Sequence, residues 1–80
     1  MKIGLYRHYK NAHLYQVIGI ACESDTDQKM VVYRALYTPE DLRAEYGEFP
    51  LFVRAYDVFC GMVDVEGVMV PRFTYVEEAR

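Results

Sequence analysis

The sequence lacks the features that mark secreted, metal-binding and membrane proteins. Its two cysteines, Cys22 and Cys60, lie far apart and outside any C-x-x-C pair, so we expect reduced thiols and a cytoplasmic location. Two histidines and two scattered cysteines give no metal-ligand spacing, and we expect neither a metal nor another cofactor. No apolar run approaches the roughly 18 residues of a membrane helix, and no signal segment is recognisable, so we expect no membrane contact.

Basic residues are also in the minority. Nine Lys and Arg residues stand against twelve Asp and Glu residues, which gives a formal net charge of −3. Binding to a phosphate backbone without sequence preference needs a basic field, so nucleic acid is a disfavoured partner, although a local basic patch is compatible with this balance. The glycines are isolated from one another, so the chain has no glycine-rich phosphate loop.

What the sequence has in surplus is aromatic residues: eight Tyr and four Phe, with no Trp, in 80 residues. Residues 1–80 are long enough for a single domain, which buries about 60% of the surface that the unfolded chain exposes. Such a domain has little fully buried volume, so some of the rings must lie at or near its surface. Tyrosine suits that position, because its ring packs while its hydroxyl group stays hydrated.

Alternating and β-branched segments predict short strands that are separated by tight turns. The longest of these runs, residues 31–37, is the predicted central strand, which can pair on both sides. The apolar strand over residues 14–22 is interrupted by Gly19, which predicts a bulge or a sharp bend. The other predicted strands and the hairpin turn share the same alternation and cover residues 4–10, 51–56, 62–65, 68–70 and 71–76, with Glu66-Gly67 as the turn.

Only residues 39–46 carry a helical signal of any strength. Thr38 is a potential cap, Pro39 fits the first helical position, Asp41 fits a capping box, and Gly47 fits the C-terminal stop. We also expect a single 3₁₀ turn over residues 57–60 and a frayed tail over residues 77–80.

Short strands and tight turns define the expected fold class. Five to six short strands with one short helix predict an all-β domain, because this chain has many strand signals and one helical signal. A small open sheet would leave exposed edges, so we expect it to curl into a small, SH3-like, partly open barrel.

The arrangement of residues from Gly4 to Phe73 resembles a family of short bacterial proteins that is catalogued as domain of unknown function 1653. The resemblance rests on the pattern Gly4-x-Tyr6-x-His8-Tyr9-Lys10, Tyr15-x-Val17, Val31-Val32-Tyr33-x-x-Leu36-Tyr37, Val53-Arg54, Phe59 and Arg72-Phe73. It implies a small β-rich domain and no established activity. The chain departs from the family pattern at Glu23, Phe52 and Ala55, where the family usually has His, Trp and Pro.

The most polar cluster that the predicted strands bring together is His8, Lys10, Asp25, Tyr33 and Arg54. We expect His8 and Tyr33 on neighbouring strands, with Arg54 reaching from the next strand. One interpretation is a hydrogen-bonded polar rim, in which Asp25 caps its own turn and Arg54 satisfies a carboxylate or a carbonyl. The other is an anion site in which the Arg54 guanidinium is the carboxylate-binding fork.

Several aromatic residues lie in strands that we expect to be adjacent: Tyr6, Tyr9, Tyr33, Tyr37, Phe52 and Tyr56. They form either the core of a Tyr-rich barrel or an open groove that holds an extended peptide or stacks single-stranded bases. Strand alternation places Phe52 with Arg54 on one face, and Tyr6 with His8 on one face. The predicted ligand-binding surface therefore consists of Tyr6, His8, Tyr33, Phe52 and Arg54.

These residues favour a binding or interaction module for a peptide or a small anionic ligand over an enzyme. The same surface is a candidate homodimer contact, because Tyr, Phe and Arg are enriched where partners dock. One alternative is single-stranded nucleic-acid binding, and another is a small enzyme that uses His8 with Asp25 or a cysteine. We assign no catalytic residue, since Cys22 and Cys60 lie in apolar sequence surroundings and are expected to be inert core thiols.

Overall fold

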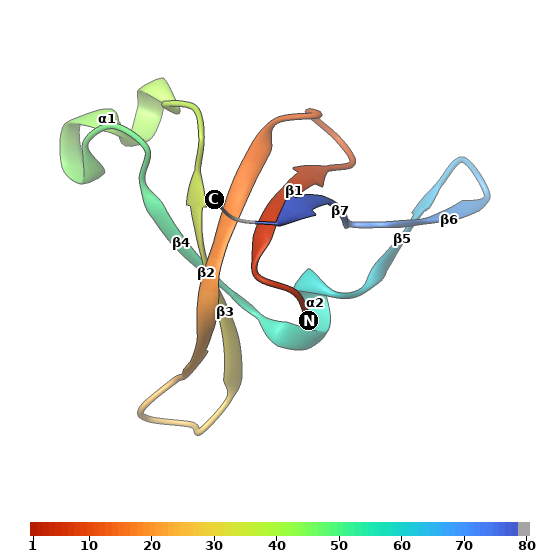
Figure 1. Ribbon diagram of the computed structural model, residues 1–80, viewed down its shortest axis with the longest axis horizontal. Coiled ribbons are helices and arrows are strands. Elements are labelled where there is room, and N and C mark those ends of the chain that lie inside the picture. Colours follow the sequence, from red (N-terminus) through yellow and green to blue (C-terminus); the bar gives the residue numbers. More distant parts are fainter. Residues whose placement is uncertain (79–80) are drawn as a thin grey trace.

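The computed structural model describes residues 1–78 and is built mostly of antiparallel strands. The elements in chain order are β1 (Gly4–His8), β2 (Leu14–Cys22), β3 (Lys29–Ala35), α1 (Glu40–Tyr46), β4 (Leu51–Ala55), α2 (Tyr56–Phe59), β5 (Met62–Val65), β6 (Val68–Pro71) and β7 (Phe73–Glu78). A five-stranded sheet has the order β4-β3-β2-β1-β7, and β5 and β6 form a separate two-stranded hairpin (Figure 1).

The five-stranded sheet curls without closing. β4 and β7 are its two edges, yet the Arg54 guanidinium on β4 lies 5.7 Å from the centre of the Phe73 ring on β7. Side chains from the two edges therefore meet across the interior, while the two edge strands remain unpaired with each other. The expected all-β, partly open barrel is confirmed, with seven strands in place of the five to six predicted.

The predicted central strand holds an inner position but not the middle one. β3 pairs on one side with β2 and on the other with β4, as its β-branched composition indicates. The middle position belongs to β2, because β1 folds back onto it and β7 then adds beyond β1. The predicted irregularity at Gly19 is present, since the β2–β3 register shifts between Val17 and Gly19.

Aromatic rings make up most of the core, which resolves the question of where the surplus of tyrosine goes. Phe59 of α2 is 1% exposed and lies in the interior of the curled sheet, where its ring stacks on Phe73 at 4.0 Å. Tyr6 and Tyr33 meet the same Phe59 ring edge-on at 5.5 and 5.2 Å. The short helical turn α2 thus supplies the central side chain of the core; an α-helical turn over Tyr56–Phe59 stands where a 3₁₀ turn over residues 57–60 was predicted.

Helix α1 lies where the sequence predicts it, but its N-terminus is built differently. Pro39 is the N-cap residue, and no side chain caps the first turn, so the prediction that Thr38 caps the helix is wrong. Gly47 ends α1 as predicted, with a φ of 75° that suits glycine and an N–H that donates to the Arg43 carbonyl. None of the described helices is long and apolar enough to cross a membrane.

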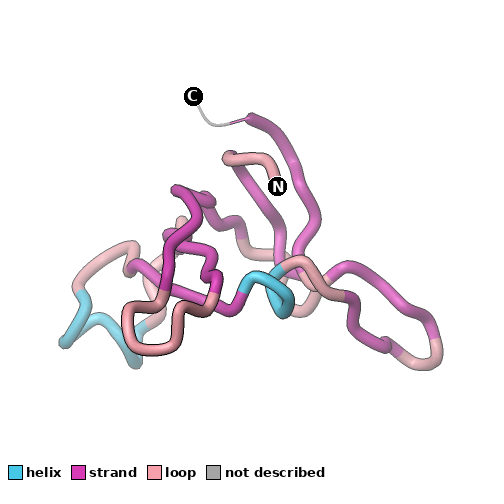
Figure 2. Tube along the Cα trace, turned by 90° about the horizontal axis from the view of Figure 1, so that it is seen from below, coloured by secondary structure: helices cyan, strands magenta, loops and turns pink. Residues whose placement is uncertain are grey.

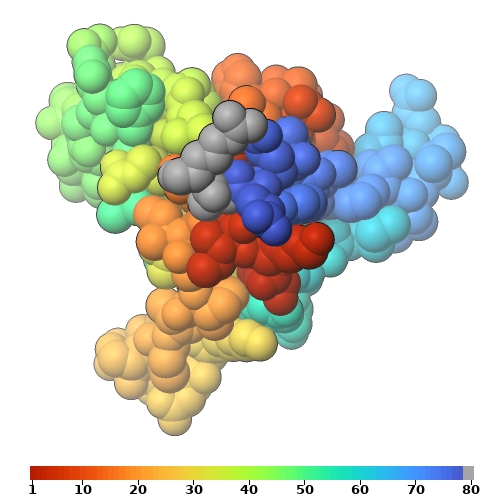
Figure 3. Space-filling view, viewed as in Figure 1, coloured from red at the N-terminus to blue at the C-terminus, as the bar shows by residue number. Residues whose placement is uncertain are grey.

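The β5–β6 hairpin projects from the body of the domain, at the opposite end from α1 (Figures 2 and 3). Its turn has positive φ at both central residues, 52° at Glu66 and 85° at Gly67, as the predicted tight hairpin requires. The Gly67 N–H donates to the Asp64 carboxylate at 2.7 Å, which closes the turn. At the other end of the chain β7 extends to Glu78, so the predicted tail begins as strand, and residues 79–80 of that tail lie outside the described residues.

Candidate functional site

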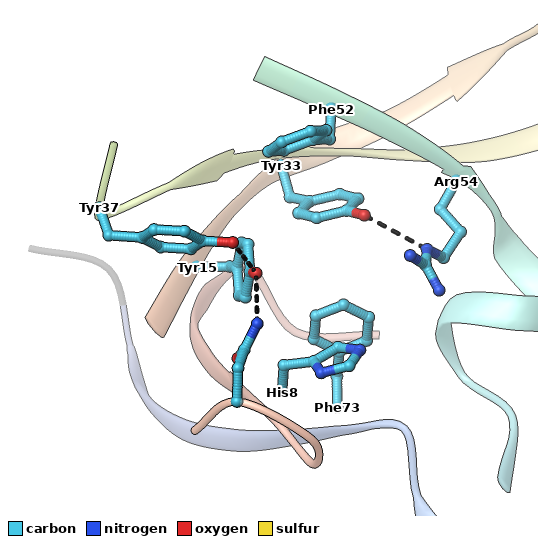
Figure 4. A pocket seen from close by; sticks show the side chains of 8 residues that line it. His8, Tyr15, Tyr33, Tyr37, Phe52, Arg54 and Phe73 are labelled. Atoms are coloured by element: carbon cyan, nitrogen blue, oxygen red, sulfur yellow. Dashed lines mark hydrogen bonds between the residues drawn. The ribbon is translucent and has the colours of Figure 1, made fainter. Parts of the chain in front are cut away.

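A pocket of about 280 Å³ opens at the seam where the two edges of the curled sheet approach each other. Its walls come from β1 to β4, from β7 and from the segments that follow β1 and β3, so it draws on most of the sheet. The lining residues are His8, Asn11, Tyr15, Tyr33, Tyr37, Phe52, Arg54 and Phe73 (Figure 4). Six of the eight are aromatic, counting His8, and none is aliphatic.

Four of the five predicted site residues line this pocket. Tyr33 and Phe52 face each other directly across the β3–β4 ladder, and their rings stack at 5.6 Å. Arg54 follows on the same face of β4, and His8 approaches from β1 on the far side. Tyr33 is only 4% exposed, so what the sequence analysis treats as an aromatic surface is the floor of a pocket in a buried core.

Tyr6, the fifth predicted residue, lies elsewhere in the core. It is 7% exposed, and its hydroxyl donates to the Lys2 carbonyl at 2.6 Å. Its ring packs edge-on against Phe59 and Tyr75, two residues that do not line the pocket. Burial raises the pKa of the Tyr6 hydroxyl, so it stays protonated as a hydrogen-bond donor.

The expectation that His8 and Tyr33 lie on neighbouring strands is wrong. Strand β2 runs between β1 and β3, and its Tyr15 ring stands between the two, 6.3 Å from the His8 ring and 5.6 Å from the Tyr33 ring. Asp25 lies in the turn between β2 and β3 and does not belong to this pocket. The Lys10 side chain does not line the pocket, but its backbone N–H donates to His8 Nδ1 at 3.2 Å.

Arg54 is the one charged side chain in the pocket lining, and it is half-buried. Its Nε donates to the Tyr33 hydroxyl at 3.3 Å (Figure 4). Within residues 1–78 its two terminal nitrogens have no hydrogen-bond acceptor, and no carboxylate lies within ion-pair distance. A guanidinium that is partly withdrawn from water without a counter-ion is ready to pair with an incoming anion.

The opposite end of the pocket carries two tyrosine hydroxyls in contact. The Tyr15 and Tyr37 oxygens lie 2.7 Å apart, and the Asn11 side-chain amide donates to the Tyr15 oxygen at 3.3 Å. Burial, and next to it the hydrogen bond with Tyr15, raise the pKa of Tyr37 far above its ordinary value. The two hydroxyls together carry two hydrogens, and since only one of them can lie between the two oxygens, the other is available to a ligand.

His8 faces the pocket as a neutral ring. Its Nδ1 accepts the Lys10 N–H, so in the neutral ring the hydrogen is on Nε2. Burial lowers the pKa of His8, and the positive charges of Arg54, Arg72 and Lys10 lower it further. Near neutral pH His8 is thus a hydrogen-bond donor through Nε2 rather than a cation.

Sequence reasoning missed four lining residues as site residues: Asn11, Tyr15, Tyr37 and Phe73, although Tyr37 was among the aromatic residues expected in adjacent strands. Tyr15 could have been found, because the short β1–β2 turn fixes the register that places Tyr15 opposite Tyr6. Phe73 could not, because it enters through the pairing of His8 with Phe73 between β1 and β7, which lie at opposite ends of the chain. Nothing in a one-dimensional pattern specifies that pairing.

The two cysteines differ from the prediction of inert core thiols, because both are exposed. Cys22 ends β2 at the far tip of the β2–β3 hairpin, where its thiol lies 3.8 Å from an Asp27 carboxylate oxygen. Cys60 follows α2, and neither cysteine is among the residues that line the pocket. In the described part of the chain no three His, Cys, Asp or Glu side chains gather in a way that could hold a metal ion.

A second hollow of about 310 Å³ lies between α1 and β4 on the other face of β4. Its lining is almost wholly apolar: Leu42, Tyr46, Pro50, Leu51, Phe52 and Val53. It has no charged or hydrogen-bonding group apart from the Tyr46 hydroxyl and backbone, so it offers no chemistry that would orient a polar ligand.

The fold and the pocket together define a small, mostly β domain with an arginine set among aromatic rings. The chain belongs to the family described as "Protein of unknown function (DUF1653)", whose family model matches residues 4–75. A crystal structure of a DUF1653 protein from Bordetella bronchiseptica superposes with a TM-score of 0.81 at 31% identity, covering 100% of this chain and 92% of that one. A comparison with curated proteins finds no match. The resemblance inferred from the sequence is thereby confirmed.

Proposed function

We propose that this domain is a binding module whose ligand is a small organic anion, held in the pocket with its negative group on Arg54. The observation that carries the proposal is the half-buried Arg54 guanidinium, whose terminal nitrogens have no partner among the described residues. Proteins seldom hold a charge out of water without compensation, and where they do so inside a pocket the missing partner is commonly a ligand.

The remaining polar groups of the pocket also favour a negatively charged ligand. The Asn11 carbonyl oxygen already accepts the His13 N–H at 2.8 Å, so one of its two lone pairs is used. The lining provides several hydrogen-bond donors that a ligand can use. They are the Arg54 guanidinium, the Tyr33 hydroxyl, one hydroxyl of the Tyr15–Tyr37 pair and His8 Nε2. A pocket lined by a guanidinium and several other hydrogen-bond donors suits a carboxylate or a similar anion.

The alternative of single-stranded nucleic-acid binding has less support. Base stacking on a module of this kind uses exposed aromatic faces along a basic groove. Here Tyr33 and Phe73 are buried, and the chain carries a net charge of −3. A gel shift at low salt with a single-stranded oligonucleotide would show binding under this alternative, and affinity would fall steeply with added salt.

The enzyme alternative requires a group for His8 to activate. The His8 ring contacts Tyr9, Tyr15 and Phe73, and its one hydrogen bond uses the Lys10 N–H. No carboxylate and no thiol contacts His8 in residues 1–78, so neither a relay nor a nucleophile pair is assembled there. The geometry therefore supports a binding module over a hydrolase or transferase.

A test of the proposal compares a carboxylate with its neutral amide. We expect benzoate, but not benzamide, to shift the amide signals of residues around the pocket in ¹H–¹⁵N NMR titrations. Replacing Arg54 with Gln should weaken benzoate binding at least about tenfold, since it removes a charged hydrogen-bonding partner.

The matched control is Arg34→Gln, which removes a cation from the neighbouring strand β3. Arg34 does not line the pocket, and its guanidinium donates to the Phe49 carbonyl at 2.7 Å. This variant should bind benzoate as the parent protein does. Equal binding of benzoate and benzamide, or equal loss in the two arginine variants, would contradict the proposal.

A further inference from the structure

The polar groups of the pocket lie near opposite ends of the Tyr33 ring. The Tyr33 hydroxyl points toward Arg54 and accepts its Nε–H at 3.3 Å, while the Tyr33 ring centre lies 5.6 Å from the Tyr15 ring at the other side. Figure 4 shows the same arrangement: Tyr15 and Tyr37 at one side of the opening, Arg54 at the other, and Tyr33 and Phe73 across from each other between them. A ligand that uses both ends must therefore be polar at two opposite positions.

Between the two ends the walls are aromatic. Tyr33, Phe52 and Phe73 form them together with the His8 ring, and no aliphatic side chain lines the pocket. Aromatic rings bind one another with a preference for edge-to-face and offset contacts, which are worth more than the apolar area alone. The rings here already use that geometry, since Phe73 meets both Tyr33 and His8 edge-on. A flat aromatic ligand extends this packing, whereas a puckered aliphatic ring does not.

The size of the pocket limits the ligand further. A volume of about 280 Å³ lies near the lower end of the roughly 300–1,000 Å³ of small-molecule pockets, so it favours a ligand as small as one six-membered ring with a carboxylate. A nucleotide or an extended peptide is larger, and part of it would lie outside the pocket.

The single positive charge in the pocket lining favours a ligand with a single negative charge. Arg54 is the one cationic side chain in the lining, and a single guanidinium neutralises a single carboxylate in a planar, two-point contact. A phosphate dianion would keep an uncompensated negative charge beside buried aromatic rings, which is costly.

We infer that the ligand is a free aromatic monocarboxylate with a hydrogen-bond acceptor on its ring opposite the carboxylate. This inference rests on the proposed function and adds the chemical class of the ligand. The carboxylate pairs with the Arg54 guanidinium, the ring lies against Tyr33 and Phe73, and the acceptor receives the free hydrogen of the Tyr15–Tyr37 pair.

The test is a set of NMR titrations with probes that differ in one property each. Cyclohexanecarboxylate has the same carboxylate and the same number of non-hydrogen atoms as benzoate, so their difference reports the aromatic walls alone. We expect benzoate to bind about three to ten times more tightly. 4-Hydroxybenzoate, which adds an acceptor opposite the carboxylate, should bind about three to ten times more tightly than benzoate, as one hydrogen bond provides.

The second polar end is tested with the double variant Tyr15→Phe and Tyr37→Phe, which removes both hydroxyls and keeps both rings. The ratio of the benzoate to the 4-hydroxybenzoate dissociation constant should fall to about one. Thermal unfolding measures separately whether the variant is folded. If the parent protein already binds benzoate and 4-hydroxybenzoate equally tightly, the acceptor opposite the carboxylate is wrong, and no variant is needed to show it.

The possible results separate the inference from the proposed function. If cyclohexanecarboxylate or inorganic phosphate binds as tightly as benzoate, and still depends on Arg54, the anion site stands and the aromatic monocarboxylate is wrong. If N-acetylphenylalanine binds more tightly than benzoate, the occupant is the end of a peptide and the inference is wrong. If no anion shifts any pocket signal, the proposed function itself is wrong.

Discussion

Phe59 is the side chain whose replacement tests the packing that holds the pocket. It is 1% exposed, and its ring contacts Phe73, Tyr33 and Tyr6. Replacement of a buried Phe with Ala costs about 3–5 kcal/mol. An 80-residue domain has a free energy of unfolding of about 4–12 kcal/mol, so Phe59→Ala should remove a large part of the stability.

Phe59→Leu is the measurable form of this change, because Leu keeps much of the apolar volume and loses the ring contacts. We expect a loss of about 1–2.5 kcal/mol in the free energy of unfolding, from lost volume and lost aromatic pairing. At about 4–8 °C per kcal/mol for a domain of this size, the melting temperature should fall by roughly 4–20 °C. Urea and thermal unfolding followed by circular dichroism measure both quantities.

Phe49→Leu is the matched control. Phe49 is 45% exposed, so its replacement should change the free energy of unfolding by no more than about 0.5 kcal/mol. If Phe59→Leu is as mild as Phe49→Leu, the stacked rings do not form the core, and the walls of the pocket are not where the structure places them.

Two other perturbations follow from backbone crowding and from titration. A Cβ at Gly61 would lie 2.9 Å from a backbone carbonyl of α2, whereas one at Gly19 would meet nothing within 4 Å. Gly61→Ala should therefore destabilise the fold by about 1–3 kcal/mol and Gly19→Ala by at most about 0.5, and equal melting temperatures would refute the difference. The pKa of His8 is lowered below its ordinary 6.5 by burial, so the unfolded chain binds the proton more tightly. The contribution of His8 to the free energy of unfolding should be fully present above pH 6.5 and be lost as the pH falls through the pKa of His8 in the folded protein. In melting curves recorded at several pH values, His8→Phe should flatten this dependence, whereas His13→Gln should leave it unchanged.

Much of the strand pattern could be predicted because it depends on local signals. The alternation in residues 51–56, the glycine in β2 and the positive-φ turn at Glu66-Gly67 each specify a local backbone shape. The cap of α1 was mispredicted because Thr38 has the right residue type, while the chain turns into the helix one residue later, at Pro39. Residue type alone does not fix the entry angle of a helix.

The candidate site could be predicted only in part, for a reason of topology. Alternation places Phe52 and Arg54 on one face, and the adjacent strand brings Tyr33 opposite Phe52, so this half of the pocket follows from local order. The other half depends on how the sheet curls and on β7 adding beyond β1, which brings Phe73 against His8. Tyr6 was misassigned because it shares a strand face with His8 but lies farther along β1, over Phe59.

Whether copies of this chain associate stays a prediction. Of the surface expected to serve a homodimer, Tyr6 and Tyr33 are buried, and His8, Phe52 and Arg54 line the pocket. The exposed apolar side chains include Val53 of β4 at 62% and, on the projecting β5–β6 hairpin, Val68 at 61% and Met69 at 58%. Light scattering at several protein concentrations measures the oligomeric state directly.

The central claim, that the pocket beside Arg54 binds an aromatic carboxylate, is tested most directly by a crystal structure of the protein grown with 4-hydroxybenzoate. The account predicts one ligand in the pocket, with its carboxylate oxygens within hydrogen-bond distance of the terminal nitrogens of Arg54 and its hydroxyl at the Tyr15–Tyr37 pair. A ligand bound in the hollow between α1 and β4, or one whose carboxylate faces away from Arg54, would contradict it.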